Sequence, residues 1–129
     1  MNGAIEVIKL AQDNGLRFAI ASSGNKEYIT RALSKFNLLS LFQNNITSIE
    51  NVKKGKPEPD LFLYAANKLK VEPKHCLVIE DAINGIKAAK CAGMQSLFLN
   101  THHKINQKAF KTRRIKSLRD INFKLLHSF

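Results

Sequence analysis

Short runs of apolar residues alternate along this chain with segments that carry apolar residues at helical spacing, and this alternation restricts the possible folds most. Apolar runs occur at Phe18–Ala21, Cys76–Ile79 and Ser96–Leu99, with a weaker one at Ile46–Ile49. Short apolar runs bounded by turn residues are typical of strands that are buried on both faces of a parallel sheet. We therefore expect four such strands.

Helices are predicted between the strands, because apolar residues recur there every three or four positions. The expected helices are Ala4–Gln12, Lys26–Phe36, Asp60–Leu69 and Ala82–Ala92, and a last one is expected to carry the apolar residues from Ile115 to Leu126. Strands that alternate with helices through short links favour right-handed crossovers. The predicted fold class is α/β, with a three-layer, Rossmann-like parallel sheet.

The size of the chain leaves room for one domain, residues 1–129, of which 44% are hydrophobic and 24% charged. This composition is not that of a disordered or low-complexity chain. The sequence contains no window of eighteen consecutive apolar residues. We therefore expect neither a membrane-spanning helix nor a secretory leader.

The positive charge is concentrated near the carboxyl terminus. The chain has a formal net charge of +11, and residues 104–129 carry eight basic residues against one acidic residue. A basic segment raises the question of a nucleic-acid partner. The segment lacks the pattern of interleaved aromatic residues and the motif that would make a convincing nucleic-acid site, so a solvated helix face is the preferred interpretation and nucleic acid is not an expected partner.

Two cysteines, Cys76 and Cys91, stand fifteen residues apart and form no CxxC motif. Neither zinc binding nor thioredoxin-type redox chemistry is supported by this spacing. The expectation is two reduced, buried thiols in a cytoplasmic protein.

Three groups of polar residues lie at the ends of predicted strands or in the link from a strand to the next helix. These residues are Ser22-Ser23-Gly24, Lys56 and the acidic pair Glu80-Asp81. In open α/β sheets, ligands bind where the carboxyl ends of the strands meet the amino ends of helices. A hydroxyl group with free backbone N–H groups, an ammonium group and two carboxylates at one such edge would hold a phosphate and a divalent cation.

Each of these residues also has a simpler interpretation. Ser22 and Ser23 could be ordinary helix-capping residues, as could Asn25 and Asp81. Lys56 could be one more solvated surface lysine among the 21 basic residues. Gly85, which follows the acidic pair, is expected to let its helix lie close to the sheet.

Three sequence motifs resemble those of the haloacid dehalogenase-like hydrolases, in the branch that contains β-phosphoglucomutase and small sugar-phosphate phosphatases. The motifs are FAIASSG, GKPEPDLFLYAA and CLVIEDAINGIKAAKCAGM, and the last is the most specific. The resemblance implies a Rossmann-like core and magnesium-dependent transfer of a phosphoryl group from a small phosphorylated metabolite.

The same resemblance assigns a role to each residue at the sheet edge. Ser22 would donate a hydrogen bond to the transferring phosphoryl group, helped by the amides of Ser23 and Gly24. Lys56 would neutralise the phosphoryl group and the attacking carboxylate. Glu80 and Asp81 would hold Mg²⁺, directly or through water.

One part of the family pattern has no counterpart in this sequence. Family members carry the nucleophilic aspartate in a D-x-D motif at the end of a strand that precedes a cap domain. This sequence has one acid-x-acid pair, Glu58 and Asp60. Glu58 lies between two prolines, Asp60 follows the second proline, and a basic loop precedes them. The resemblance therefore implies an incomplete core that lacks the first strand and the cap, and we expect the isolated chain to be inactive.

The family topology would place the absent strand between Phe18–Ala21 and Leu77–Ile79. These two strands are expected either to close against each other or to receive a strand from a second molecule or a separately encoded segment. Three functional hypotheses follow: one part of a split or truncated phosphotransfer enzyme, a non-catalytic remnant that binds phosphate or a partner, and, as the least favoured, a basic nucleic-acid-binding module.

Overall fold

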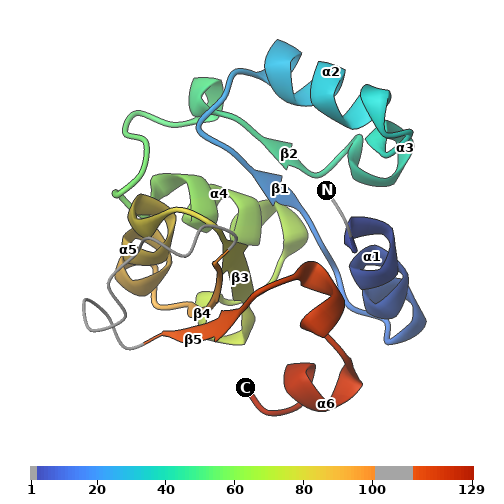
Figure 1. Cartoon of the computed structure of the whole chain (residues 1–129). Helices are drawn as coiled ribbons and strands as arrows, with labels where there is room; N and C mark the ends of the chain where they lie inside the picture. The colour runs from blue at the N-terminus through green and yellow to red at the C-terminus, as the bar shows by residue number, and fades with distance from the viewer. Residues whose placement is uncertain (1–2, 101–111) are drawn as a thin grey trace.

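The computed structural model describes residues 3–100 and 112–129, and it contains alternating helices and parallel strands (Figure 1). The α-helices are α1 (Ala4–Asp13), α2 (Lys26–Lys35), α3 (Leu39–Phe42), α4 (Asp60–Leu69), α5 (Ile83–Cys91) and α6 (Phe123–Leu126). The strands are β1 (Ile20–Ala21), β2 (Ile46–Thr47), β3 (Leu77–Glu80), β4 (Gln95–Leu99) and β5 (Arg113–Ile115). Short 3₁₀ turns occur at η1 (Ile49–Asn51), η2 (Pro73–His75) and η3 (Leu118–Asp120). The predicted α/β class is confirmed.

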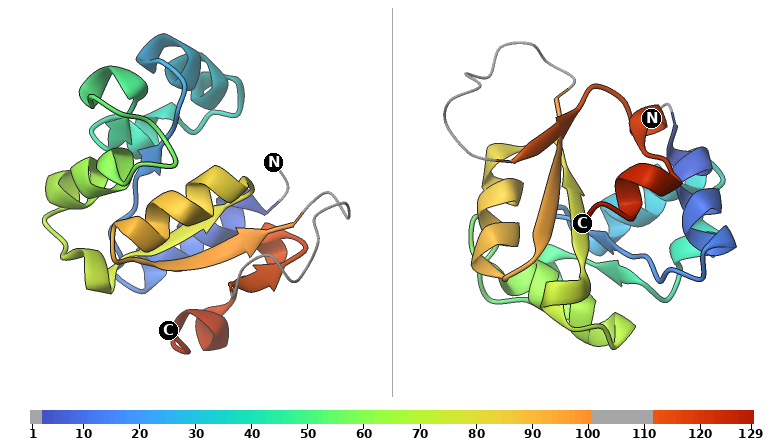
Figure 2. Two further views of the ribbon diagram at one scale, coloured as in Figure 1. Left: turned by 90° about the vertical axis from the view of Figure 1, so that its left-hand side faces the viewer. Right: turned by 90° about the horizontal axis from the view of Figure 1, so that it is seen from below.

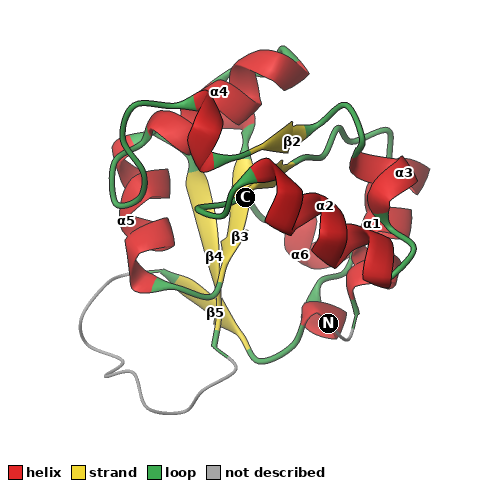
Figure 3. Cartoon of the chain, turned by 90° about the horizontal axis from the view of Figure 1, so that it is seen from above, coloured by secondary structure: helices red, strands yellow, loops and turns green. Residues whose placement is uncertain are grey.

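The described strands form two separate parallel sheets. One contains β1 and β2, and the other has the order β3-β4-β5. Figure 3 shows β3, β4 and β5 as one group, with β2 apart from them. In the part of the chain that the structure describes, β1 and β3 do not pair with each other. The expectation that these two strands close directly against each other is therefore wrong.

The free edge of β1 faces away from β2. The amides of Ile20 and Ser22 donate to Asn45 O at 2.9 Å and to Thr47 O at 3.0 Å, both on the β2 side. Because neighbouring residues of a strand direct their backbone groups to opposite edges, those of Ala21 point away from β2. The oxygen of Ala21 accepts a hydrogen bond from Lys56 Nζ, which also contacts the last residue of β3. The unpaired edge of β1 thus lies on the side of β3.

Helices cover both faces of the larger sheet. Ala88 and Ala89 of α5 pack with Val78 of β3 on one face. Leu77 and Ile79 point to the other face, into a cluster with residues of α1 and of the carboxyl-terminal segment. Figure 2 shows α5 on one side of β3 and β4, with α1 and α6 on the other. This gives the three layers expected of a Rossmann-like fold.

Helix α1 packs against both sheets. Its residue Ile8 lies in the cluster that contains Ile46 and the partly buried Ile20 of the smaller sheet. Val7 and Leu10 pack with the cluster that contains Leu97 of the larger sheet. Helix α1 therefore holds the two sheets side by side although no backbone ladder joins them.

The carboxyl-terminal segment differs from the single helix that its apolar residues predict. It forms β5, η3 and α6 instead, because polar side chains bind the backbone locally. Asp120 Oδ2 accepts hydrogen bonds from the amides of Lys116 at 3.0 Å and Ser117 at 3.1 Å, and Asn122 Oδ1 accepts from the amide of Leu125 at 2.9 Å. Such bonds compete with helical ones. The basic positions from Lys104 to Lys111 lie outside the described residues.

The two thiols differ in exposure. Both are free, but Cys91 is exposed on α5 and Cys76 is only partly buried, so the expectation of two buried thiols is wrong. Burial raises the pKa of the Cys76 thiol above its usual value. Within residues 3–100 and 112–129, no helix has the length and apolar character needed to cross a bilayer.

Candidate functional site

The Ser22-Ser23-Gly24 loop follows β1 directly and leads to Asn25, which precedes α2. Ser22 Oγ accepts a hydrogen bond from the Gly24 amide at 3.1 Å, and the Gly24 oxygen accepts one from the Ile49 amide at 3.2 Å. Ser23 is exposed. The Ser22 hydroxyl therefore shapes its own loop here, and the Gly24 amide already has a partner within it.

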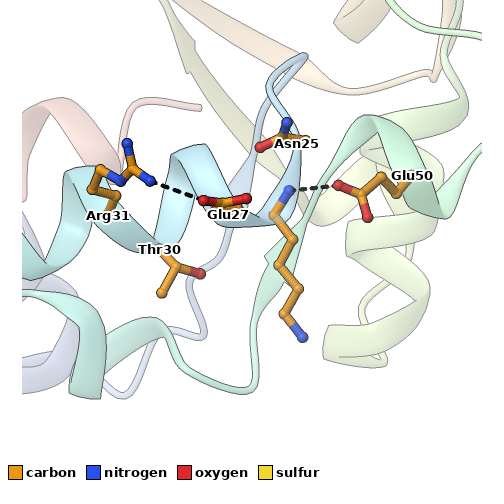
Figure 4. A pocket seen from close by; sticks show the side chains of 6 residues that line it. Asn25, Glu27, Thr30, Arg31 and Glu50 are labelled. Carbon is orange, nitrogen blue, oxygen red and sulfur yellow. Dashed lines mark hydrogen bonds and ion pairs between the residues drawn. The ribbon is translucent and has the colours of Figure 1, made fainter.

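Protein side chains satisfy two of the amides at the start of α2. Asn25 Oδ1 accepts from the Tyr28 amide at 2.8 Å, and Glu50 Oε1 accepts from the Lys26 amide at 3.0 Å. Asn25 is therefore the N-cap of α2, in agreement with the simpler interpretation of this residue. The shallow pocket beside it (Figure 4) is lined by Asn25, Lys26, Glu27, Thr30, Arg31 and Glu50. The carboxylate of Glu50 already occupies the anion-attracting position in this pocket.

Lys56 is held at the point where the two sheets meet. Its Nζ atom lies 3.2 Å from the Ala21 oxygen and 3.2 Å from Glu80 Oε1. The ammonium group also lies 4.9 Å from the centre of the Phe62 ring, a cation–π distance. The Lys56 side chain is only 11% exposed. The interpretation of Lys56 as a solvated surface lysine does not describe this position.

The loop before α4 positions this lysine. Residues 53–59 form turns that end at Pro59, after which α4 begins with Asp60. Helix α4 buries Leu61 and Ala65 and thereby fixes Phe62 beneath the ammonium group. Phe62 lies in the predicted helix Asp60–Leu69, whose apolar spacing gives no indication of a contact with Lys56.

Glu80 is the last residue of β3, and its side chain is 14% exposed. Oε1 accepts a hydrogen bond from Lys56, whereas Oε2 is buried and has no hydrogen-bond partner among the described residues. Burial raises the pKa of the Glu80 carboxyl above its usual value; the Lys56 ammonium opposes this shift, and Asp81 adds to it. Asp81 follows directly and is exposed.

The structure thus brings the predicted residues to one edge. Lys56 contacts the ends of both β1 and β3, Ser22 adjoins Ala21 in the chain, and Asp81 adjoins Glu80. Direct side-chain contact is present between Lys56 and Glu80. The edge therefore combines a partly buried cation, a partly buried carboxylate, an exposed carboxylate and a hydroxyl-bearing loop.

The donor set at this edge suits Mg²⁺, which prefers oxygen ligands and is usually held by one or two carboxylates together with water and substrate phosphate. Glu80 Oε2 is a buried oxygen without a partner, and Asp81 is an accessible carboxylate next to it. No group of three or more His, Cys, Asp or Glu side chains with metal-binding geometry occurs in the described ranges. These two carboxylates fit the smaller number of protein ligands that Mg²⁺ accepts.

Comparison with known proteins finds relatives in sequence and in structure. Validoxylamine A 7'-phosphate phosphatase from Streptomyces hygroscopicus subsp. limoneus is 36% identical over 103 residues, which are 80% of this chain and 48% of that protein. The crystal structure of a HAD hydrolase (family IA, variant 3) from Entamoeba histolytica HM-1:IMSS superposes with a TM-score of 0.89 at 28% identity, covering 98% of this chain and 59% of that one.

A β-phosphoglucomutase structure from Clostridium difficile superposes with a TM-score of 0.82 at 26% identity, covering 98% of this chain and 54% of that one. The chain thus spans about half the length of these relatives. The family model of haloacid dehalogenase-like hydrolases matches residues 1–93, which include all three motifs up to Gly93. The chain therefore belongs to the haloacid dehalogenase-like hydrolase family.

Proposed function

We propose that this chain supplies the phosphate-binding and magnesium-binding part of a centre that transfers a phosphoryl group from a small phosphorylated metabolite. Relatives that include a phosphatase and a phosphomutase support this reaction class. Ser22, Ser23, Gly24 and Lys56 would bind the phosphate, and Glu80 and Asp81 would hold Mg²⁺. The identity of the metabolite is left open.

The observation that carries the proposal is the position of the Lys56 ammonium. It joins the carboxyl ends of both sheets through Ala21 and Glu80, in a setting where little water reaches it. Phosphoryl transfer depends mainly on positive charge placed against the phosphoryl oxygens. An ammonium group that is held from two sides can supply this charge without reorganising during the reaction.

The Ser22 loop would take part after a local change in hydrogen bonding. Ser22 Oγ now accepts from the Gly24 amide. A bound phosphate oxygen could accept a hydrogen bond from the same amide, and the Ser22 hydroxyl could donate a hydrogen bond to another phosphate oxygen. Both groups would then bind the substrate.

Asp81 and Glu80 would hold Mg²⁺, which when bound would supply positive charge to offset that of the substrate phosphate. The accessible carboxylate of Asp81 is suited to direct contact with the ion. Glu80, whose Oε2 has no hydrogen-bond partner among the described residues, would contribute to holding the ion directly or through water. The Lys56 contact holds the other Glu80 oxygen in place.

The attacking carboxylate would come from a strand between β1 and β3. In the described residues each of these strands has one paired edge, and the free edge of β1 lies on the side of β3. An inserted parallel strand would join the two sheets into one. A carboxylate at its carboxyl end would arrive beside Lys56, which offers charge complementarity. The strand would come from another segment of the protein or from a second molecule.

Complementation tests this proposal. The chain is mixed with a peptide that carries a D-x-D strand of the family, and magnesium-dependent hydrolysis of p-nitrophenyl phosphate is measured. We expect hydrolysis that disappears with Lys56→Ala or Asp81→Ala. Lys54→Ala is the matched control, because Lys54 is exposed two residues from Lys56.

Two results would contradict the proposal. One is equal hydrolysis with a peptide in which both aspartates are replaced by asparagine, since the carboxylate would then play no part. The other is the absence of hydrolysis when the peptide is shown by NMR to bind between β1 and β3. In the second case, retained binding of inorganic phosphate would favour a non-catalytic phosphate-binding domain.

A further inference from the structure

The side chain of Glu80 occupies the space that a side chain at position 85 would fill. Gly85 lies in the first turn of α5 and is buried. A Cβ atom added to Gly85 would lie 2.5 Å from Glu80 Cγ and closer still to Glu80 Cδ and Oε2. Real Cβ atoms essentially never approach another atom below 3.0 Å. Any larger residue at position 85 therefore requires the Glu80 side chain to move from its present position.

Backbone conformation does not explain a glycine at this position. The backbone of Gly85 does not adopt the left-handed conformation that favours glycine, unlike that of Gly93. Glycine is also among the least favourable residues within a helix. Further along α5, Ala88 and Ala89 pack on the sheet as buried residues that carry a Cβ atom. The close approach of α5 to the sheet at Gly85 is thus a contact with the side chain of Glu80, the last residue of β3.

The recess at Gly85 determines where the Glu80 carboxylate lies. One oxygen, Oε2, lies over Gly85, and the other, Oε1, accepts a hydrogen bond from Lys56 at 3.2 Å. A side chain at position 85 would push the carboxylate away from α5. The Lys56 ammonium would then lose the contact on the β3 side and keep the one with the Ala21 oxygen.

We propose that Gly85 is a positioning residue, whose missing side chain creates the recess that holds the Glu80 carboxylate against the Lys56 ammonium. This inference rests on the proposed function only for the role of the Lys56–Glu80 pair in the candidate phosphoryl-transfer site. The contact itself is tested below without measuring catalysis, so that failure of this proposal and failure of the proposed function are distinguishable.

A double-mutant cycle on the full chain tests the contact. Thermal unfolding is followed by circular dichroism for wild type, Gly85→Ala, Glu80→Ala and the double variant. We expect Gly85→Ala to lower the unfolding temperature in wild type, because the new methyl group overlaps Glu80. In the Glu80→Ala background the same change should raise that temperature, because alanine favours the helix and the space is free. An equal effect of Gly85→Ala in both backgrounds would overturn the proposal.

The chemical reactivity of Lys56 tests whether the recess at Gly85 holds the Glu80 carboxylate against the Lys56 ammonium. Reductive methylation with labelled formaldehyde, read by peptide mass spectrometry, compares Lys56 with the exposed Lys54 in the same molecule. We expect Lys56 to react several-fold faster in Gly85→Ala and in Glu80→Ala than in wild type. Asn84→Ala is the control, because Asn84 is the exposed neighbour of Gly85 in α5.

Each outcome of the labelling either supports or overturns the positioning role of Gly85. An unchanged rate for Lys56 in a folded Gly85→Ala protein would overturn the positioning role, even if the unfolding temperature falls. If Gly85→Ala does not fold, the comparison of Glu80→Ala with the double variant still decides, since neither carries the overlap. A lower unfolding temperature of the double variant would then contradict the proposal.

Discussion

The Lys56 ammonium and the Glu80 carboxylate lie 3.2 Å apart, although their side chains are only 11% and 14% exposed. The pair connects the loop before α4 to the end of β3, and the same ammonium reaches the last residue of β1. Charged groups are removed from water at considerable cost, and a partner left alone in such a place is destabilising. The pair is therefore a stability determinant as well as a part of the candidate site.

Replacement of Lys56 by methionine should leave Glu80 as a buried, unpaired carboxylate. We expect the free energy of unfolding at neutral pH to fall by about 2–4 kcal/mol, slightly below the value for fully buried pairs because some solvent reaches both groups. Urea denaturation measures this change. Lys74→Met is the control: its partner Glu72 lies 3.3 Å away, but these side chains are 71% and 69% exposed, so the loss should stay below about 0.5 kcal/mol. Equal losses in the two variants would contradict the importance of burial.

Ionisation of Glu80 should contribute to the pH dependence of the free energy of unfolding. Its pKa is raised in the folded chain from the usual value of 4.5, with burial as the main cause. Between 4.5 and the raised pKa, the folded state binds more protons than the unfolded state, so this group's contribution to stability is present at low pH and is lost as the pH rises.

Comparison with Glu80→Gln isolates this contribution. We expect the free energy of unfolding of wild type, relative to that of Glu80→Gln, to decrease as the pH rises from 4.5 towards neutrality, in buffers that contain EDTA. Glu72→Gln serves as the control, because Glu72 is well exposed. A relative stability of wild type that increases with pH over this range would show that the Lys56 contact outweighs burial.

The sequence predicted those parts of the fold in which local and tertiary preferences agree. The limits of α4, Asp60–Leu69, were predicted correctly because prolines precede this helix and its apolar stripe packs on the core. The carboxyl-terminal segment was predicted wrongly because its apolar residues fit helical spacing while Asp120 and Asn122 bind the backbone. The spacing of apolar residues indicates which residues are buried, and Ile115, Leu118 and Ile121 are indeed buried. They lie, however, in different parts of the segment and not in one helix.

The site was predictable as a set of residue types and not as a set of contacts. Glycine and proline around Lys56, together with the acidic pair after an apolar strand, singled out the relevant positions. The contact of Lys56 with Glu80 joins residues 24 positions apart, and that with Ala21 joins residues 35 positions apart. Neither has a local sequence signal. The overlap between Gly85 and Glu80 likewise depends on the path of α5 across the end of β3.

Asn25 should act as a helix cap in a way that a stability measurement detects. Its side chain accepts a hydrogen bond from the Tyr28 amide at 2.8 Å. Asn25→Ala removes this bond and should lower the free energy of unfolding by about 1 kcal/mol, as is typical of N-caps. Asn67→Ala, in the exposed interior of α4, should not destabilise the protein, because alanine favours a helix. Urea denaturation of both variants makes the comparison, and no loss in Asn25→Ala would contradict the cap.

Two leucines of α4 test whether the core fixes the helix that supports Lys56. Leu61 is fully buried, with 0% exposure, whereas Leu63 is 40% exposed. Leu61→Ala removes buried methyl groups and leaves a cavity, so the free energy of unfolding should fall by about 2–5 kcal/mol. Leu63→Ala changes the same number of atoms in the same helix and should cost less than about 1 kcal/mol, because much of that side chain is already in water. Equal losses in urea denaturation would show that α4 does not pack as the structure has it, and would remove the support for the contact between Phe62 and Lys56.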